Sequence, residues 1–268
     1  MSSCGHHHHH HHHGGASASV HNQEYFNKEA ANHDAKHGNS LDRLLEEIRE
    51  RTDFIGADWV EDHDEEGDVE AGKKDDRPQK SVRLLDYACG TGLGRLSLQA
   101  LAPYTTQCVG IDLSENMVAT YNMRAENQGL FPAEMRAYQG NLCVPDDPNS
   151  AAFASPEFLN FDVAAVGLGF HHFDDPALAA RRLAERLRAG GVLMIVDFMP
   201  HGKPDASHPA SHTVTHHGFS QDHVRRLFED AGVGKDFAIE EMAVVLNIPK
   251  ENGPEVRRSL FIARGTKA

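Results

Sequence analysis

Short apolar runs and longer amphipathic stretches alternate along the chain from residue 81 onward. Runs rich in Val, Ile and Leu indicate buried strands, and apolar positions spaced three and four apart indicate helices. This alternation predicts an α/β fold, doubly wound, with a mostly parallel sheet and helices on both faces. The expected strands lie near residues 82–87, 107–112, 134–139, 162–168, 191–197, 237–246 and 259–264, and the expected helices near 92–101, 115–128, 176–187 and 220–231.

The first 80 residues depart from this pattern and divide into three parts. The beginning of the chain contains eight consecutive histidines among Gly, Ala and Ser, which is typical of a purification tag. A helical pattern follows, because Leu41, Leu44 and Ile48 recur on one face behind a capping Ser40. The next stretch is strongly acidic and lacks apolar periodicity, so we expect a solvated linker. The predicted organisation is a tag at 1–19, helices and acidic linker at 20–80, and the α/β core at 81–268.

Composition narrows the classes of function. The formal net charge of −14 argues against a nucleic-acid partner, because such binding depends on clustered Lys and Arg. No apolar run approaches the roughly 20 residues that a membrane-spanning helix needs. Outside the tag, Cys89, Cys108 and Cys143 are an odd number without a C-x-x-C pair, which indicates a reduced, intracellular setting. We expect the cytoplasm, and leave the mitochondrion and a homodimer open.

A glycine-rich turn follows the first expected strand in the segment LLDYACGTG, and the segment VGIDLS follows at residues 109–114. Gly90 and Gly92 allow a sharp turn and a close approach of the backbone to a ligand. A helix starting there would direct its amide dipole at that ligand, so the turn predicts a nucleoside site. A dinucleotide fingerprint needs a third glycine where Arg95 stands, which argues against NAD.

These segments resemble the class I S-adenosylmethionine (SAM) dependent methyltransferases. The resemblance rests on Asp86 at the strand end, the C-G-T-G turn, the G-I-D-L-S segment and Met117, and it extends from Val82 to Asp197. It implies a Rossmann-like, seven-stranded, mostly parallel sheet with an antiparallel C-terminal edge pair. It also implies an N-terminal helical lid that closes over SAM.

The resemblance implies a role for each residue around the cofactor. Asp112 is expected to bind the ribose hydroxyls, although capping of the following helix is the alternative. Met117 packs either against adenine or in the core. Asn141 stands where the family usually has Asp, and its amide oxygen is expected to accept from the adenine amino group. The complete expected cofactor set is Tyr25, Asp86, Ala88, Gly90, Asp112, Leu113, Met117, Asn141, Leu142 and Gly167.

The chemistry is expected after the fourth strand, in the run FDVAAVGLGFHHF at residues 161–173. The Asn/Asp-Pro-Pro-aromatic signature of methyltransferases that act on adenine amines is absent here. A phenol titrates near 10 and needs a base or a metal at neutral pH, and histidine is a suitable base. His171 or His172 is the expected base, with His33 reaching toward the acceptor from the lid. The alternative is that both loop histidines only bind backbone.

A second group of histidines follows the fifth strand and is expected to form one wall of an acceptor pocket. These residues could hold a divalent cation, but their spacing matches no standard ligand set, so no metal ligand is assigned. The group consists of His201, His208, His212, His216 and His217, with Asp197 and Asp205.

The segments EYFNKEA and GLGFHHF are similar to those of fungal small-molecule methyltransferases, including relatives of the ubiquinone pathway and of a flavonoid or catechol O-methyltransferase type. This resemblance implies O-methylation of an aromatic vicinal diol as the activity, with a small aromatic molecule as acceptor. Methylation of carbon or sulfur on a quinol or thiol, and a non-catalytic SAM-binding protein, are the alternatives.

Overall fold

The structure is a computed structural model that describes residues 18–29, 38–60, 80–90, 100–148, 150–202, 213–248 and 253–268. These residues form a seven-stranded sheet in the order β3-β2-β1-β4-β5-β7-β6. Strands β1 to β5 run parallel, and β7 runs antiparallel to both of its neighbours. The strands are β1 (Arg83–Tyr87), β2 (Gln107–Asp112), β3 (Met135–Gln139), β4 (Phe161–Gly167), β5 (Leu187–Phe198), β6 (Lys235–Ile248) and β7 (Val256–Thr266). The predicted fold class is therefore confirmed.

Three of the described helices begin behind a residue whose side chain caps them. Ser114 accepts a hydrogen bond from the Met117 backbone N–H, and Asp175 and Ser220 cap later helices in the same way. The expected helix at 92–101 lies almost entirely outside the described residues. The helices are α1 (Ala18–Glu29), α2 (Gly38–Arg49), α3 (Thr52–Ile55), α4 (Glu115–Asn127), α5 (Pro176–Arg186) and α6 (Gln221–Asp230), with short 3-10 helices η2 (Ala102–Tyr104), η3 (Ala151–Phe153), η4 (Pro156–Phe158) and η5 (Phe170–His172).

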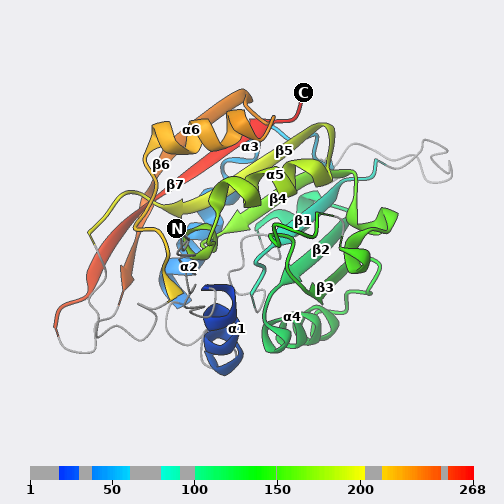
Figure 1. Ribbon diagram of the computed structural model, residues 1–268, viewed down its shortest axis with the longest axis horizontal. Coiled ribbons are helices and arrows are strands. Elements are labelled where there is room, and N and C mark those ends of the chain that lie inside the picture. Colours follow the sequence, from blue (N-terminus) through cyan, green and yellow to red (C-terminus); the bar gives the residue numbers. More distant parts are fainter. Residues whose placement is uncertain are drawn as a thin grey trace, which may run out of the picture.

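Alternate strand residues face opposite sides of the sheet and bury two separate cores. Leu84 packs in a core with side chains of α2, α3 and α4, whereas its neighbour Leu85 packs with side chains of α5 and α6. Helices thus cover both faces of the sheet (Figure 1). No described helix has the length and apolar content to cross a membrane.

The structure extends strands β5, β6 and β7 beyond their predicted bounds, most of all at the start of β5. Strand β5 begins at Leu187 rather than near 191, because Leu187 pairs with Phe161 of β4. Arg188 and Ala189, which follow, are partly and fully exposed, so they interrupt the pattern of buried apolar residues that would have indicated this extension. Helix α1 begins at Ala18, two residues inside the segment expected to be the tag.

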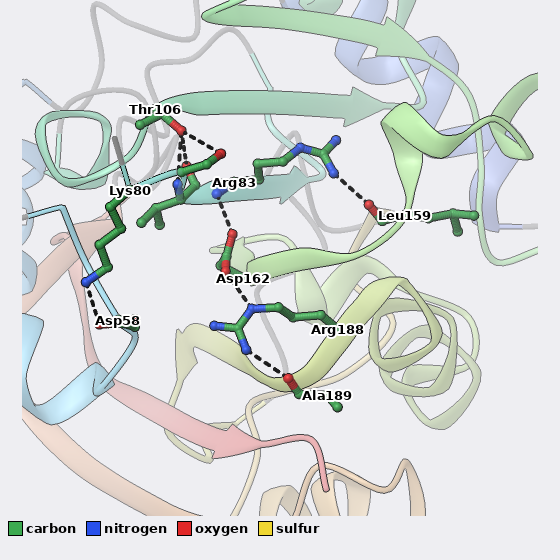
Figure 2. A network of polar contacts seen from close by, with 10 residues as sticks. Asp58, Lys80, Arg83, Thr106, Leu159, Asp162, Arg188 and Ala189 are labelled. Carbon is green, nitrogen blue, oxygen red and sulfur yellow. Dashed lines mark hydrogen bonds and ion pairs between the residues drawn. The ribbon is translucent and has the colours of Figure 1, made fainter. Parts of the chain in front are cut away.

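Polar side chains occupy the amino ends of the parallel strands (Figure 2). The Asp162 carboxylate at the start of β4 accepts from the Arg83 backbone N–H at 2.7 Å and from Arg188 Nε at 2.6 Å, so it joins β1, β4 and β5. Arg83 also donates to the Leu159 carbonyl at 2.7 Å. Lys80 and Asp58 form an ion pair nearby, with 74% of the Asp58 side chain exposed. These side chains bind one another at the amino ends of the strands. A ligand site is therefore expected at the opposite edge of the sheet, at the carboxyl ends.

We expect Asp162→Ala to lower the free energy of unfolding by about 2 kcal/mol, because it removes charge-assisted hydrogen bonds between three strands. Asp58→Ala is the matched control in the same network, and loss of its exposed ion pair should cost less than about 1 kcal/mol. Urea denaturation measures both. Equal effects of the two substitutions would contradict the assigned role of Asp162.

Candidate functional site

The candidate site lies where the order of strands reverses, between β1 and β4, at the carboxyl ends of both. In open α/β sheets this point is the usual place for a ligand. Ala88 and Leu168 follow these strands with left-handed φ angles of 57° and 56°, a costly conformation for residues other than glycine. A Cβ built on Gly169 would lie 3.0 Å from Ala88 Cβ, so the two loops touch. The backbone is therefore strained, and the two loops approach each other closely, at the turn predicted to bind the cofactor.

Asp112 ends β2 and holds the glycine turn. One carboxylate oxygen accepts from the Gly90 backbone N–H and the other from the Ser114 backbone N–H, both at 2.8 Å. Burial raises the pKa of Asp112, although these N–H groups act in the opposite direction. Additional donors, such as the hydroxyls of a ribose, would stabilise its charged form. The side chain of Ser114 caps α4. Asp112 does not cap this helix itself but accepts from the backbone N–H of the capping residue.

Asn141 is positioned by a network that the sequence did not reveal. Its Oδ1 accepts from the Cys143 backbone N–H at 2.8 Å and from the Tyr87 hydroxyl at 3.2 Å. The Tyr87 oxygen in turn accepts from the Leu142 backbone N–H. The oxygen expected to meet adenine is therefore already engaged, and a new bond there requires the Tyr87 proton to turn away. The adenine contact of Asn141 stays a prediction.

The other expected cofactor residues lie around the same edge. Met117 is buried in the first turn of α4, and Leu113 accepts through its carbonyl from Gln139. Asp86 is buried in β1, and its charge contributes to the raised pKa of Cys89 and Tyr121, after burial itself. Gly167 ends β4. These positions are compatible with the predicted roles without testing them.

His171 and Asp197 form a buried pair between the ends of β4 and β5. His171 Nδ1 lies 2.8 Å from Asp197 Oδ1, and the His171 backbone N–H donates to Asp197 Oδ2 at 3.1 Å. The Phe198 backbone N–H supplies a further bond. Burial alone would raise the pKa of Asp197, but His171 and these donors lower it below its ordinary value. An ionised carboxylate therefore holds the proton on Nδ1, so a neutral His171 ring carries no proton on Nε2.

His172 has its ring fixed in a similar way. Its Nδ1 lies 2.7 Å from the Thr213 carbonyl, which can only accept, so Nδ1 carries the proton. The ring lies 4.0 Å from that of His171 and edge-on to Phe26 at 5.3 Å. The alternative expectation was that both histidines bind only backbone. Nδ1 of His172 does contact a backbone carbonyl, but Nδ1 of His171 contacts the Asp197 carboxylate.

Helix α1 spans the site from the cofactor side to the histidines. At one end, Asn27 accepts from the Ser114 hydroxyl and, through its carbonyl, from Asn116 Nδ2 at 2.9 Å. Toward the other end, Asn22 Nδ2 donates to the His172 carbonyl at 3.0 Å, and Ser19 donates to Asp174. Figure 1 shows α1 beside α4. These contacts place α1 where the expected lid would lie.

From the lid, Tyr25 had been expected among the cofactor residues and His33 near the acceptor. The Tyr25 ring packs edge-on to Phe26 at 5.2 Å, and burial, followed by the charge of Glu29, raises the pKa of Tyr25. His33 lies outside the described residues. Neither predicted role is tested by these positions.

The histidines after β5 are partly placed. His201 and His217 have ring centroids 6.0 Å apart, and the His216 backbone N–H donates to the His171 carbonyl at 3.1 Å. His208, His212 and Asp205 lie outside the described part of the chain. Within that part, no group of three His, Cys, Asp or Glu side chains is arranged to hold a metal ion.

Some residues of the site escaped sequence reasoning. No sequence motif marks Asn22, Asn27 or Thr213, because their hydrogen-bond partners lie between 41 and 150 positions away along the chain. Tyr87 was visible only as an apolar strand residue. Asp197 had been noted as a neighbour of the histidines after β5, but not as the partner of His171. A carboxylate at a strand end after a double histidine was the one signal that could have suggested this pair.

Comparisons with known proteins agree with this geometry. Residues 85–195 match the family described as a methyltransferase domain. An uncharacterized methyltransferase of Schizosaccharomyces pombe is 30% identical over 161 residues, which are 58% of this chain and 54% of that protein. A demethylmenaquinone methyltransferase of Thermus thermophilus is 32% identical over 118 residues, covering 44% of this chain and 48% of that protein. The chain thus spans about half the length of these curated relatives.

Solved structures show the same fold. The YcgJ protein of Bacillus subtilis has a TM-score of 0.52 and 18% identity, covering 70% of this chain and 92% of that chain. A chain of the complex containing the Trm112 methyltransferase activator of Haloferax volcanii has a TM-score of 0.58 and 15% identity, covering 90% and 96%. These likenesses show the fold, and the methyltransferase domain match over residues 85–195 supports the predicted resemblance to SAM-dependent methyltransferases.

We expect Asp112→Ala to weaken binding of S-adenosylhomocysteine at least tenfold in calorimetry, because it removes hydrogen bonds to a charged acceptor. Asp112→Asn should lie between this variant and the unchanged protein, since one amide oxygen remains. Asp222→Ala, at an exposed position on α6, is the control and should bind normally. Unaltered binding by Asp112→Ala would contradict the assigned cofactor side of the site.

Because the pKa of Asp197 is lowered in the folded protein, the stability of the fold depends on pH. Because the folded pKa lies below the ordinary 3.8, ionised Asp197 stabilises the fold above about pH 4, and this contribution is lost as pH falls through the folded pKa. We expect Asp197→Asn to be less stable than the unchanged protein near pH 6, with a difference that shrinks below about pH 4. Denaturation across this range checks the expectation, and a difference independent of pH would contradict it.

Proposed function

We propose that this protein is a SAM-dependent methyltransferase that methylates a hydroxyl of a small aromatic vicinal diol. The observation that carries the proposal is the His171–Asp197 pair, which lies at the end of the strand adjoining the glycine turn. The methyltransferase domain match across the same strands supports the reaction class. The identity of the acceptor and of the methylated atom is our inference from the chemistry of this pair and its surroundings.

The residues on the cofactor side fit SAM. Asp112 offers a half-buried carboxylate with unused lone pairs, and no described atom beyond Gly90 and its chain neighbours lies within 4 Å of the place where a Cβ on Gly90 would stand. Asp112 would hold the ribose, and Met117 and Asn141 would flank the adenine. When bound, SAM supplies a methyl group on a cationic sulfur whose leaving group departs neutral, so alignment and exclusion of water dominate the rate. Helix α1, bound at both ends of the site, would exclude that water.

His171 would then act as the general base. Asp197 holds Nδ1–H, so Nε2 can take the proton of an acceptor hydroxyl, and the buried carboxylate stabilises the imidazolium that forms. Proton removal matters for a phenol, because its hydroxyl titrates near 10 and is a weak nucleophile while protonated. Oxygen is therefore the favoured acceptor atom.

Aromatic rings surround the two histidines and favour a planar acceptor. Phe198 lies 5.0 Å from the His171 ring, and Phe26 lies 5.3 Å from His172. Such edge-on rings offer apolar contacts to an aromatic molecule while the histidines supply the polar ones. This combination supports a phenolic acceptor over an aliphatic one.

A second candidate is methylation of a carbon atom on a quinol. The similarity to a demethylmenaquinone methyltransferase favours it, and the same base could deprotonate a quinol hydroxyl. Mass spectrometry with nuclear magnetic resonance of the product separates the two, because an O-methyl ether and a ring methyl group differ in chemical shift.

The test measures methyl transfer from labelled SAM to catechols and quinols, with and without magnesium or manganese. We expect His171→Ala to lower kcat on a catechol by about 100-fold or more without changing the KM for SAM. Raising the pH toward 10, where a phenol ionises unaided, should restore part of the rate. His21→Ala, an exposed residue of α1, is the control and should retain full activity.

Two results would contradict the proposal. A protein that binds SAM but methylates none of these acceptors is not the enzyme described here. If His171→Ala keeps full activity at neutral pH, another group removes the proton.

A further inference from the structure

Unpartnered polar atoms gather around the His171–His172 dipeptide. Among the described residues, four buried side-chain atoms lack a hydrogen bond: Asn22 Oδ1, Arg182 Nε, His216 Nε2 and His217 Nδ1. Three of the four lie on the two segments that bind this dipeptide through its carbonyls. A buried polar atom without a partner costs about 1–3 kcal/mol, so such a concentration indicates a place where a polar ligand completes the bonding.

The orientation of Asn22 is fixed by its partner. A carbonyl oxygen only accepts, so the amide nitrogen of Asn22 must face the His172 carbonyl, at 3.0 Å, and Oδ1 is the free end. The residue is 94% buried, since its exposed fraction is 6%. Asn27 and Ser19 bind α1 to other loops on either side of Asn22, which keeps Asn22 at the His172 carbonyl while α1 is in place. The site therefore contains a fixed acceptor beside the catalytic histidines.

The chemistry of this atom selects its ligand. Asn22 Oδ1 can only accept, so it needs a group that donates, such as a hydroxyl. His171 belongs to the dipeptide that Asn22 binds, and its Nε2 would need a hydroxyl too, in order to take the proton. Two hydroxyls on adjacent carbons of one ring would satisfy both needs, whereas a single phenol would leave Asn22 unpartnered.

We propose that Asn22 is a specificity residue for the diol: its Oδ1 accepts a hydrogen bond from the hydroxyl that is not methylated, while His171 takes the proton of the hydroxyl that is. This inference rests on the proposed function. It adds a recognition role for α1 beyond covering the site. An acceptor whose second oxygen already carries a methyl group cannot donate and is disfavoured, so the enzyme stops after one methylation.

The test compares kcat/KM for catechol and for its mono-methyl ether, 2-methoxyphenol, with labelled SAM. The unchanged protein should prefer catechol about tenfold or more, as expected for one hydrogen bond to a buried acceptor. Asn22→Leu removes the acceptor, and the preference should fall to about twofold or less. Asn22→Asp retains an acceptor oxygen but loses the donor to His172, so it should lower both rates while keeping the preference.

Asn27→Leu is the matched control, because it also removes an amide that binds α1. It should slow both acceptors in the same proportion. Circular dichroism confirms that each variant is folded, and if Asn22→Leu does not fold, Asn22→Ser supplies a variant too short to reach the same donor.

The outcomes separate this inference from the function on which it rests. An unchanged protein that turns over neither acceptor overturns the proposed function. An active protein whose preference survives in folded Asn22→Leu or Asn22→Ser overturns the role of Asn22 alone, and shows that the residue only binds α1 to the loop.

Discussion

A fully buried carboxylate at the end of β5 determines the arrangement of the site. Ionised Asp197 could not be buried without compensation, and it obtains this from His171 Nδ1 and from the backbone N–H groups of His171 and Phe198. These bonds tie the loop after β4 to the loop after β5. The His171 carbonyl then accepts from the Thr215 and His216 backbone N–H groups, which extends the same constraint along the second loop.

The second constraint joins remote parts of the sequence. Helix α1 binds the loop before α4 through Asn27 and the His172 carbonyl through Asn22, although these partners are 87 and 150 positions away. One element thereby contacts both the loop before α4 and the loop after β4. A helix held mainly by polar contacts can be released at modest cost, since each such bond contributes about 1 kcal/mol net. This suits an element that admits a ligand and then excludes water.

The sequence predicted the sheet well, because its strands follow local patterns, whereas the roles of the cofactor residues stay predictions. The glycine turn and the strand that ends at Asp112 are readable from spacing alone. For His171 and His172 the sequence did not distinguish the role of each residue, since that role depends on which carbonyl or carboxylate the Nδ1 atom meets. Asn141 illustrates the limit: its residue type suggested a free oxygen, but the structure engages that oxygen with Tyr87 and Cys143. Such contacts arise from packing, not from spacing.

The tautomer of His171 tests this account most directly. Long-range nitrogen–proton correlation spectra of the ¹⁵N-labelled protein at alkaline pH distinguish which ring nitrogen carries the proton. We predict a proton on Nδ1 of His171, and its loss or redistribution in Asp197→Asn. A neutral ring with the proton on Nε2 in the unchanged protein would contradict the account, because that nitrogen could not then take a proton from an acceptor.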